Sequence, residues 1–100
     1  MSYALYCEGK RLGSLATITG YGEVIGAVDS YNSQRGGGGK TPALTELVET
    51  GHSDDPRKVA EDISKLLTWG EHLPRTTVST LKNLKQMLAR AQGSVVVGES

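Results

Sequence analysis

The sequence lacks the features that mark secreted and membrane proteins. It contains a single cysteine, Cys7, so no intramolecular disulfide can form and a secreted, cross-linked scaffold is excluded. The first eight residues contain neither a basic segment nor an apolar segment, and no apolar run approaches the roughly eighteen residues of a membrane-spanning helix. We therefore expect a soluble protein of the reducing cytoplasm that has no contact with a membrane.

An excess of charge of one sign is also absent. Eleven Lys and Arg residues balance eleven Asp and Glu residues, which removes the global basic excess that non-specific nucleic-acid binding usually needs. The 37% apolar and 22% charged residues are typical of a chain that folds, and 100 residues suffice for one hydrophobic core. We predict a single domain over residues 1–100 that requires no metal ion, disulfide or cofactor.

Alternating side chains predict strands at the two ends of the chain. Residues 3–7 and 11–19 are rich in strand-forming residues and flank Gly9, which indicates a β-hairpin. Residues 94–98 include three consecutive valines between small residues, a pattern typical of a buried strand. The segment Gly20-Tyr21-Gly22 is expected to end the second strand.

Apolar residues at helical spacing predict four helices in the middle of the chain. The first covers residues 22–33. The second covers 42–50, with Thr41 as N-cap and Pro42 at the first helical position, and the third covers 56–68 after Asp55 and Pro56. The fourth covers 77–91 and can be capped by Thr76 or Thr77.

These elements predict an α+β fold with the order ββααααβ. A small antiparallel sheet of about three strands, formed by the N-terminal hairpin and the C-terminal strand, would be covered on one face by three to four helices. The position of the last strand remains open. If it lies at an edge, its unpaired groups can pair with a second copy, so a homo-oligomer is one expectation.

A glycine-rich segment separates the first two helices. Residues 34–40 include four consecutive glycines and no apolar side chain, so we expect a flexible loop. The alternative is an anion site on backbone N–H groups at Gly38, Gly39, Lys40 and Thr41. The phosphate-loop pattern is not met, because Gln34 stands where that pattern has glycine and a helix precedes the loop.

The residues that could support catalysis or metal binding have no recognisable spacing. Cys7 with His52 or His72 would make a nucleophile and base, but Cys7 continues the alternation of a strand and both histidines lie in polar connections, where we expect them to be solvated. We assign no catalytic residue, no metal ligand and no enzymatic activity. We expect Asp54 and Asp55 to cap a helix and Glu61 to pair with Lys65. The acids of this part of the chain are expected to form a solvated acidic surface: Glu46, Glu49, Asp54, Asp55, Glu61 and Asp62.

One stretch of the sequence is basic without compensating acids. Residues 72–98 contain no Asp or Glu, and the cations of the predicted last helix fall opposite its apolar stripe. We predict a non-enzymatic interaction protein, such as an inhibitor, adaptor or self-associating module, whose protein partner presents an acidic surface. The alternatives are a nucleic-acid-binding module that uses the same helix and a small enzyme or anion binder. The predicted partner-binding residues are Arg75, Lys82, Lys85, Gln86, Arg90 and Trp69.

Overall fold

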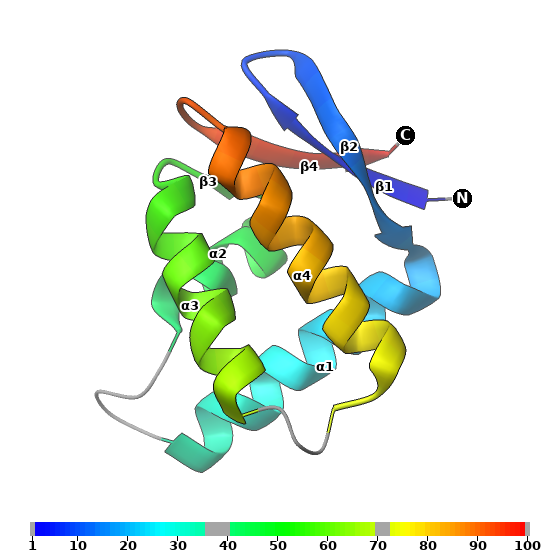
Figure 1. The fold of residues 1–100 in the computed structure, drawn as a ribbon, viewed down its shortest axis with the longest axis vertical. Helices are drawn as coiled ribbons and strands as arrows, with labels where there is room; N and C mark the ends of the chain where they lie inside the picture. Colours follow the sequence, from blue (N-terminus) through cyan, green and yellow to red (C-terminus); the bar gives the residue numbers. More distant parts are fainter. Residues whose placement is uncertain (1, 36–40, 70–72, 100) are drawn as a thin grey trace.

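The computed structural model describes residues 2–35, 41–69 and 73–99 and has the predicted order of elements with one further strand (Figure 1). The additional strand follows the second helix and consists of two residues, too few for a sequence to show alternation. The elements are β1 (Ser2–Cys7), β2 (Lys10–Thr17), α1 (Ile18–Arg35), α2 (Pro42–Thr50), β3 (His52–Ser53), α3 (Pro56–Trp69), α4 (Arg75–Arg90) and β4 (Val95–Glu99).

The four strands form one antiparallel sheet in the order β2-β1-β4-β3. The two strands from opposite ends of the chain, β1 and β4, therefore lie side by side at its centre. Glu8 and Gly9 connect β1 to β2 with positive φ angles of 52° and 82°, the left-handed backbone that a two-residue hairpin turn favours. Because β4 is internal, it has no free edge through which it could pair with a strand of a second copy.

Register shifts in the hairpin interrupt its simple alternation. The pairing skips Leu12 and Leu15 of β2, which makes each the extra residue of a β-bulge. Leu15 is buried in the core and Leu12 packs against it. The bulges thus let two leucines three positions apart face the same side of a strand.

All four helices lie on one side of the sheet, and α3 and α4 lie in front of α2 in Figure 1. The apolar stripes predicted for α3 and α4 are buried: Val59, Ile63, Leu66 and Leu81 have no exposed surface. The strands contribute Leu5, Cys7, Leu15 and Val95 to the same core. The α+β fold with a sheet covered on one face is confirmed.

The first helix is longer at both ends than the sequence indicates. It begins at Ile18 and runs through Gly20 and Gly22, so the expected break after residue 19 is wrong, and it continues to Arg35, where a loop was expected. Glycine costs about 1 kcal/mol within a helix, but tertiary contacts oppose this cost. The Tyr21 ring packs on Tyr3 of β1 with 4.9 Å between centroids. The glycine-rich residues 36–40 lie outside the described residues.

A buried carboxylate caps α2 from a different helix. Thr41 stands before the helix as predicted, but its hydroxyl donates to Asn32 Oδ1 and makes no capping bond. The cap comes from Asp62 of α3, whose Oδ2 accepts the N–H groups of Ala43 at 2.9 Å and Leu44 at 3.1 Å. The expectation of a solvated Asp62 is therefore wrong, since it is 5% exposed. The positive end of α2 and the ammonium of Lys65, 3.5 Å away, make this burial favourable.

The start of α4 uses a similar contact between helices. The helix begins at Arg75, two residues before the predicted start, with Pro74 in the N-cap position. Thr76 and Thr77 do not cap it, because both hydroxyls donate to Glu23 Oε2 of α1, at 3.0 and 3.3 Å. Asp55 does act as the predicted cap of α3, accepting the N–H of Lys58.

The last strand is buried at one of its three valines. Val95 has no exposed surface, Val97 is partly buried against the core and Val96 is 44% exposed. The prediction of a buried strand is therefore wrong for Val96, which lies on the side of the sheet away from the helices. Within the described part of the chain, no helix has both the length and the apolar character needed to span a membrane.

Candidate functional site

Helix α4 presents the predicted cations to solvent. Its buried side is formed by Leu81, Leu84, Met87 and Leu88, and the helical period places the polar residues opposite. Arg75 and Arg90 stand at its two ends, about 22 Å apart at 1.5 Å per residue. The exposed residues of the predicted partner surface on this helix are Arg75, Lys82, Lys85, Gln86 and Arg90.

Two side-chain hydrogen bonds attach α4 to strand β2. Asn83 Nδ2 donates to the carbonyl of Ser14 at 2.9 Å, and Arg90 Nη2 donates to the carbonyl of Leu12 at 3.1 Å. Between them the Met87 sulfur lies so close to Gly13 that an added Cβ would be 2.9 Å from it. Part of the Arg90 guanidinium is thus occupied in holding the helix. This contact could not be predicted from the sequence, because it joins residues 78 positions apart.

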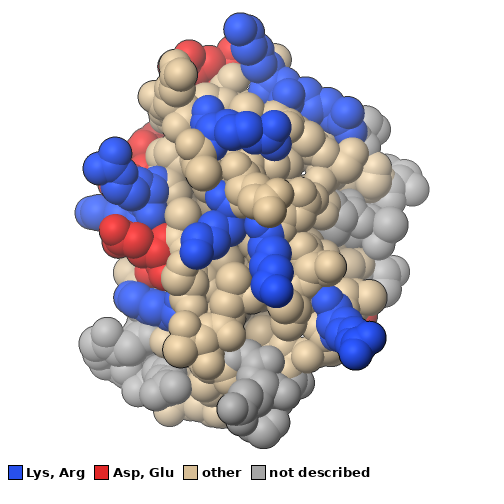
Figure 2. Space-filling model, in the orientation of Figure 1, with Lys and Arg blue, Asp and Glu red and all other residues tan. Residues whose placement is uncertain are grey.

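The attachment brings a cation of the hairpin next to those of the helix. Lys10 and Arg90 line one small pocket of about 250 Å³, together with Glu8 at the hairpin turn. We call Arg75, Lys82, Lys85, Arg90 and Lys10 the basic face. Figure 2 shows Lys and Arg spread over the side of the molecule that α4 occupies, with most of the visible Asp and Glu at its left and upper margins.

No acid of the described residues lies within ion-pair distance of Lys82, Lys85 or Lys10. An uncompensated group of cations produces a local positive potential although the whole chain has no net charge. This potential is the property that could attract an acidic partner.

Trp69 is separate from the basic face. It is the last residue of α3 and its ring meets Tyr31 edge to face, with 5.4 Å between centroids and 83° between planes. It lines a groove of about 380 Å³ between α1 and the start of α4, together with Gly26 and Leu73. The Trp69 ring therefore packs at the edge of the core, and this position does not support the prediction that it binds a partner.

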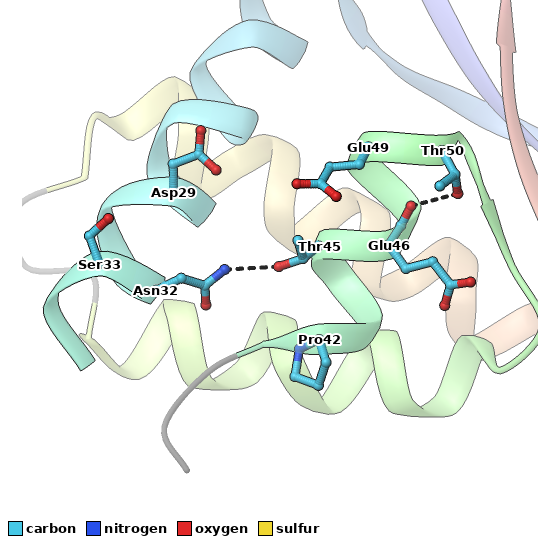
Figure 3. A pocket seen from close by; sticks show the side chains of 8 residues that line it. All are labelled: Asp29, Asn32, Ser33, Pro42, Thr45, Glu46, Glu49 and Thr50. Atoms are coloured by element: carbon cyan, nitrogen blue, oxygen red, sulfur yellow. Dashed lines mark hydrogen bonds between the residues drawn. The ribbon is translucent and has the colours of Figure 1, made fainter. Parts of the chain in front are cut away.

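The acids gather on a different side of the molecule. A groove of about 800 Å³ between α1 and α2 is lined by Asp29, Glu46 and Glu49, and the described residues that line it include no cation. Figure 3 shows the carboxylates of Asp29 and Glu49 directed into the gap between the helices. Asn32 Nδ2 donates to Thr45 Oγ1 at 2.8 Å across one end of it. Glu46 and Glu49 are exposed as predicted. Asp29 was not predicted to lie beside them, because its position depends on how α1 packs against α2.

Two of the three residues considered for catalysis, Cys7 and His52, lie on opposite faces of the sheet. Cys7 lies on the helix-facing side of the sheet, 7% exposed, with its Sγ 3.9 Å from the carbonyl of Gly93. His52 pairs with Val96 on the opposite side, and its Nε2 is 3.3 Å from Asp54. His72 lies outside the described residues. Among the residues that are described, no three His, Cys, Asp or Glu side chains are placed to hold a metal ion.

Of the four residues of the alternative anion site, the structure describes Thr41. Thr41 has no exposed surface, and its N–H and its hydroxyl both donate to Asn32 Oδ1 at 3.0 Å. These bonds occupy both groups that Thr41 could have offered to an anion. Gly38, Gly39 and Lys40 fall in a segment whose structure is not described.

Comparison with known proteins gives no match to a family model, to a curated protein or to a solved structure. What the protein does must therefore be inferred from the surfaces of this chain.

Proposed function

We propose that the protein is a non-enzymatic interaction module that binds an acidic protein surface through its basic face. The observation that carries the proposal is the group of cations on α4 and β2, whose lysines have no acid of the described residues within ion-pair distance. Opposite charges steer association and fix the orientation of a complex, and their removal weakens both.

The attachment of α4 supports this role. Asn83 and Arg90 hold the helix against β2, so Lys82 and Lys85 project from a fixed helix. A surface that is already ordered loses little conformational entropy when it binds. The helix therefore requires no rearrangement to meet a partner.

Nucleic acid fits the basic face less well than an acidic protein. Five cations are few for a phosphate backbone, and no aromatic residue stands among those of α4 to stack on a base. The carboxylates of the α1–α2 groove add a repulsive contribution for any long polyanion that extends around the molecule.

The test is a charge reversal with a matched control. We expect Lys82→Glu with Lys85→Glu to weaken binding of a fluorescent decaglutamate peptide at least about tenfold at low salt, because both substitutions turn attraction into repulsion. Fluorescence anisotropy over a series of salt concentrations gives the affinity. Both residues are exposed, so the melting temperature should stay close to that of the wild type.

The control changes the net charge equally on the neighbouring helix α3. Arg57→Glu with Lys58→Glu reverses two exposed cations of α3, outside the basic face, and should weaken binding by less than about threefold. Equal losses in the two variants would assign the binding to net charge and contradict the proposal. Tighter binding of a single-stranded oligonucleotide of equal charge would assign the basic face to nucleic acid instead.

A further inference from the structure

The side of the sheet away from the helices carries one continuous row of residues, one from each strand. The strand pairings align Arg11 of β2 with Tyr6 of β1, Tyr6 with Val96 of β4, and Val96 with His52 of β3. We call these four residues the outer row. The adjacent row faces the helices, since its members Cys7, Val95 and Ser53 are 7%, 0% and 2% exposed. Successive residues of a strand point to opposite faces, so the outer row faces away from the helices.

The centre of the outer row is apolar. Val96 is 44% exposed and is the large aliphatic residue that the described surface leaves most open. The Tyr6 ring beside it lies over Gly98, where an added Cβ would be 3.3 Å from the ring, and its hydroxyl donates to the carbonyl of Glu99. The ring is held along the sheet, so it offers a flat surface next to Val96.

The two ends of the outer row carry opposite charges. At the β2 end, Arg11 is exposed and its Nη2 donates to Ser14 Oγ at 2.6 Å. At the β3 end, the carboxylate of Asp54 lies 3.3 Å from His52 Nε2 and accepts a hydrogen bond from Ser94. An apolar centre with a charged rim is the usual anatomy of a protein–protein contact.

We infer that the outer row is the contact surface of a symmetric homodimer. A two-fold axis parallel to the strands, between β1 and β4, reverses the row in the second copy and places Arg11 opposite His52 and Asp54. The same axis places Tyr6 opposite Val96. An axis across the strands would place Arg11 opposite Arg11, so charge selects the first arrangement. Two sheets can pack face to face in this way with their side chains interdigitated.

The edges of the sheet do not offer an equivalent way to pair. Two carbonyls of β2, those of Leu12 and Ser14, accept hydrogen bonds from α4, and β3 at the other edge has two residues. Covered and very short edge strands are poor templates for strand addition. The carboxylate of Asp54 borders the outer face and disfavours a nucleic acid there.

A charge exchange tests the arrangement. Sedimentation velocity between about 10 µM and about 1 mM should show a concentration-dependent dimer of the full chain. Arg11→Glu and Asp54→Lys should each weaken the dimer at least about tenfold, because each places like charges opposite one another. The double variant should recover to within about threefold of the wild type, since it restores opposite charges across the two-fold axis. Val96→Glu should leave a monomer.

The controls separate this inference from the proposed function. Lys85→Glu lies on the basic face and should leave the dimer unchanged, and Arg11→Glu with Asp54→Lys should bind decaglutamate as the wild type does. A wild type that is monomeric at about 1 mM, or a double variant no better than the single variants, would overturn the dimer. Binding of a single-stranded oligonucleotide that Val96→Glu abolishes would also overturn it and assign the outer row to nucleic acid.

Discussion

Val95 and Val96 are neighbours in β4 with identical side chains, yet they belong to different environments. Val95 lies on the helix-facing side of the sheet with no exposed surface, and Val96 lies on the outer side with 44% of its surface exposed. Complete burial of a valine contributes about 1.5 kcal/mol or more to stability. The two faces of the sheet therefore differ: the inner face stabilises the fold, and the outer face leaves Val96 open to solvent.

The largest difference between the faces is expected at Leu5, at the centre of the inner face. Leu5→Ala should lower the free energy of unfolding by about 2 to 5 kcal/mol, because it leaves a cavity in the core between the sheet and the helices. Chemical denaturation monitored by circular dichroism measures the change. Ser14→Ala, on the exposed side of β2, should change it by less than about 0.5 kcal/mol. Similar values for the two variants would contradict the assignment of the faces.

A smaller and better matched difference is expected at the two valines. Val95→Thr should cost about 1 to 3 kcal/mol, because it places a hydroxyl without a partner in the core. Val96→Thr, an equal change in shape and polarity, should cost less than about 0.5 kcal/mol. The measurement is urea unfolding at low protein concentration, where association does not contribute. Equal losses of unfolding free energy at both positions would show that the outer side of β4 is also buried.

The smallest effect is expected from the aromatic pair on the inner face. Burial raises the pKa of Tyr21 above its ordinary value of 10.0, and the neighbouring Tyr3 adds to the shift. Since the folded state holds this proton more tightly than the unfolded chain, the resulting stability is complete below about pH 10 and is lost as the pH rises above it.

Tyr21→Phe tests this pH dependence. The variant should show a smaller loss of stability between about pH 9 and about pH 11 than the wild type, because it has no phenol to titrate. Tyr6→Phe, which alters the outer face, should retain the loss seen in the wild type. Melting temperatures across this range provide the measurement. Identical profiles for the wild type and Tyr21→Phe would show that Tyr21 is not the cause of the loss of stability at high pH.

The sequence was most informative where structure depends on neighbouring residues. The helix over 42–50 was predicted with both of its ends, and the helix that starts at Pro56 was one residue short, since proline start signals and apolar stripes act within a few turns. The exposure of Lys82 and Lys85 followed from the same helical period. The candidate basic face could therefore be located in part from sequence.

The sequence could not assign the three consecutive valines to the two faces of the sheet. Identical residues carry no alternation, so the register of β4 against β1 and β3 decides which valine is buried. Strand β3 was missed for a related reason, because two residues form a strand only through their pairing with β4. The outer row, which takes one residue from each strand, depends on both of these pairings.

By itself the sequence determined the class of the fold, the helices of its second half and the basic character of the last one, because each follows from residues close together in the chain. The tertiary structure decided which distant groups meet. Asp62 caps α2, Arg90 reaches the carbonyl of Leu12, and Arg11 and His52 share one row across four strands. Such contacts depend on the complete packing of the chain, since a buried polar group binds whichever partner the fold brings within hydrogen-bond distance.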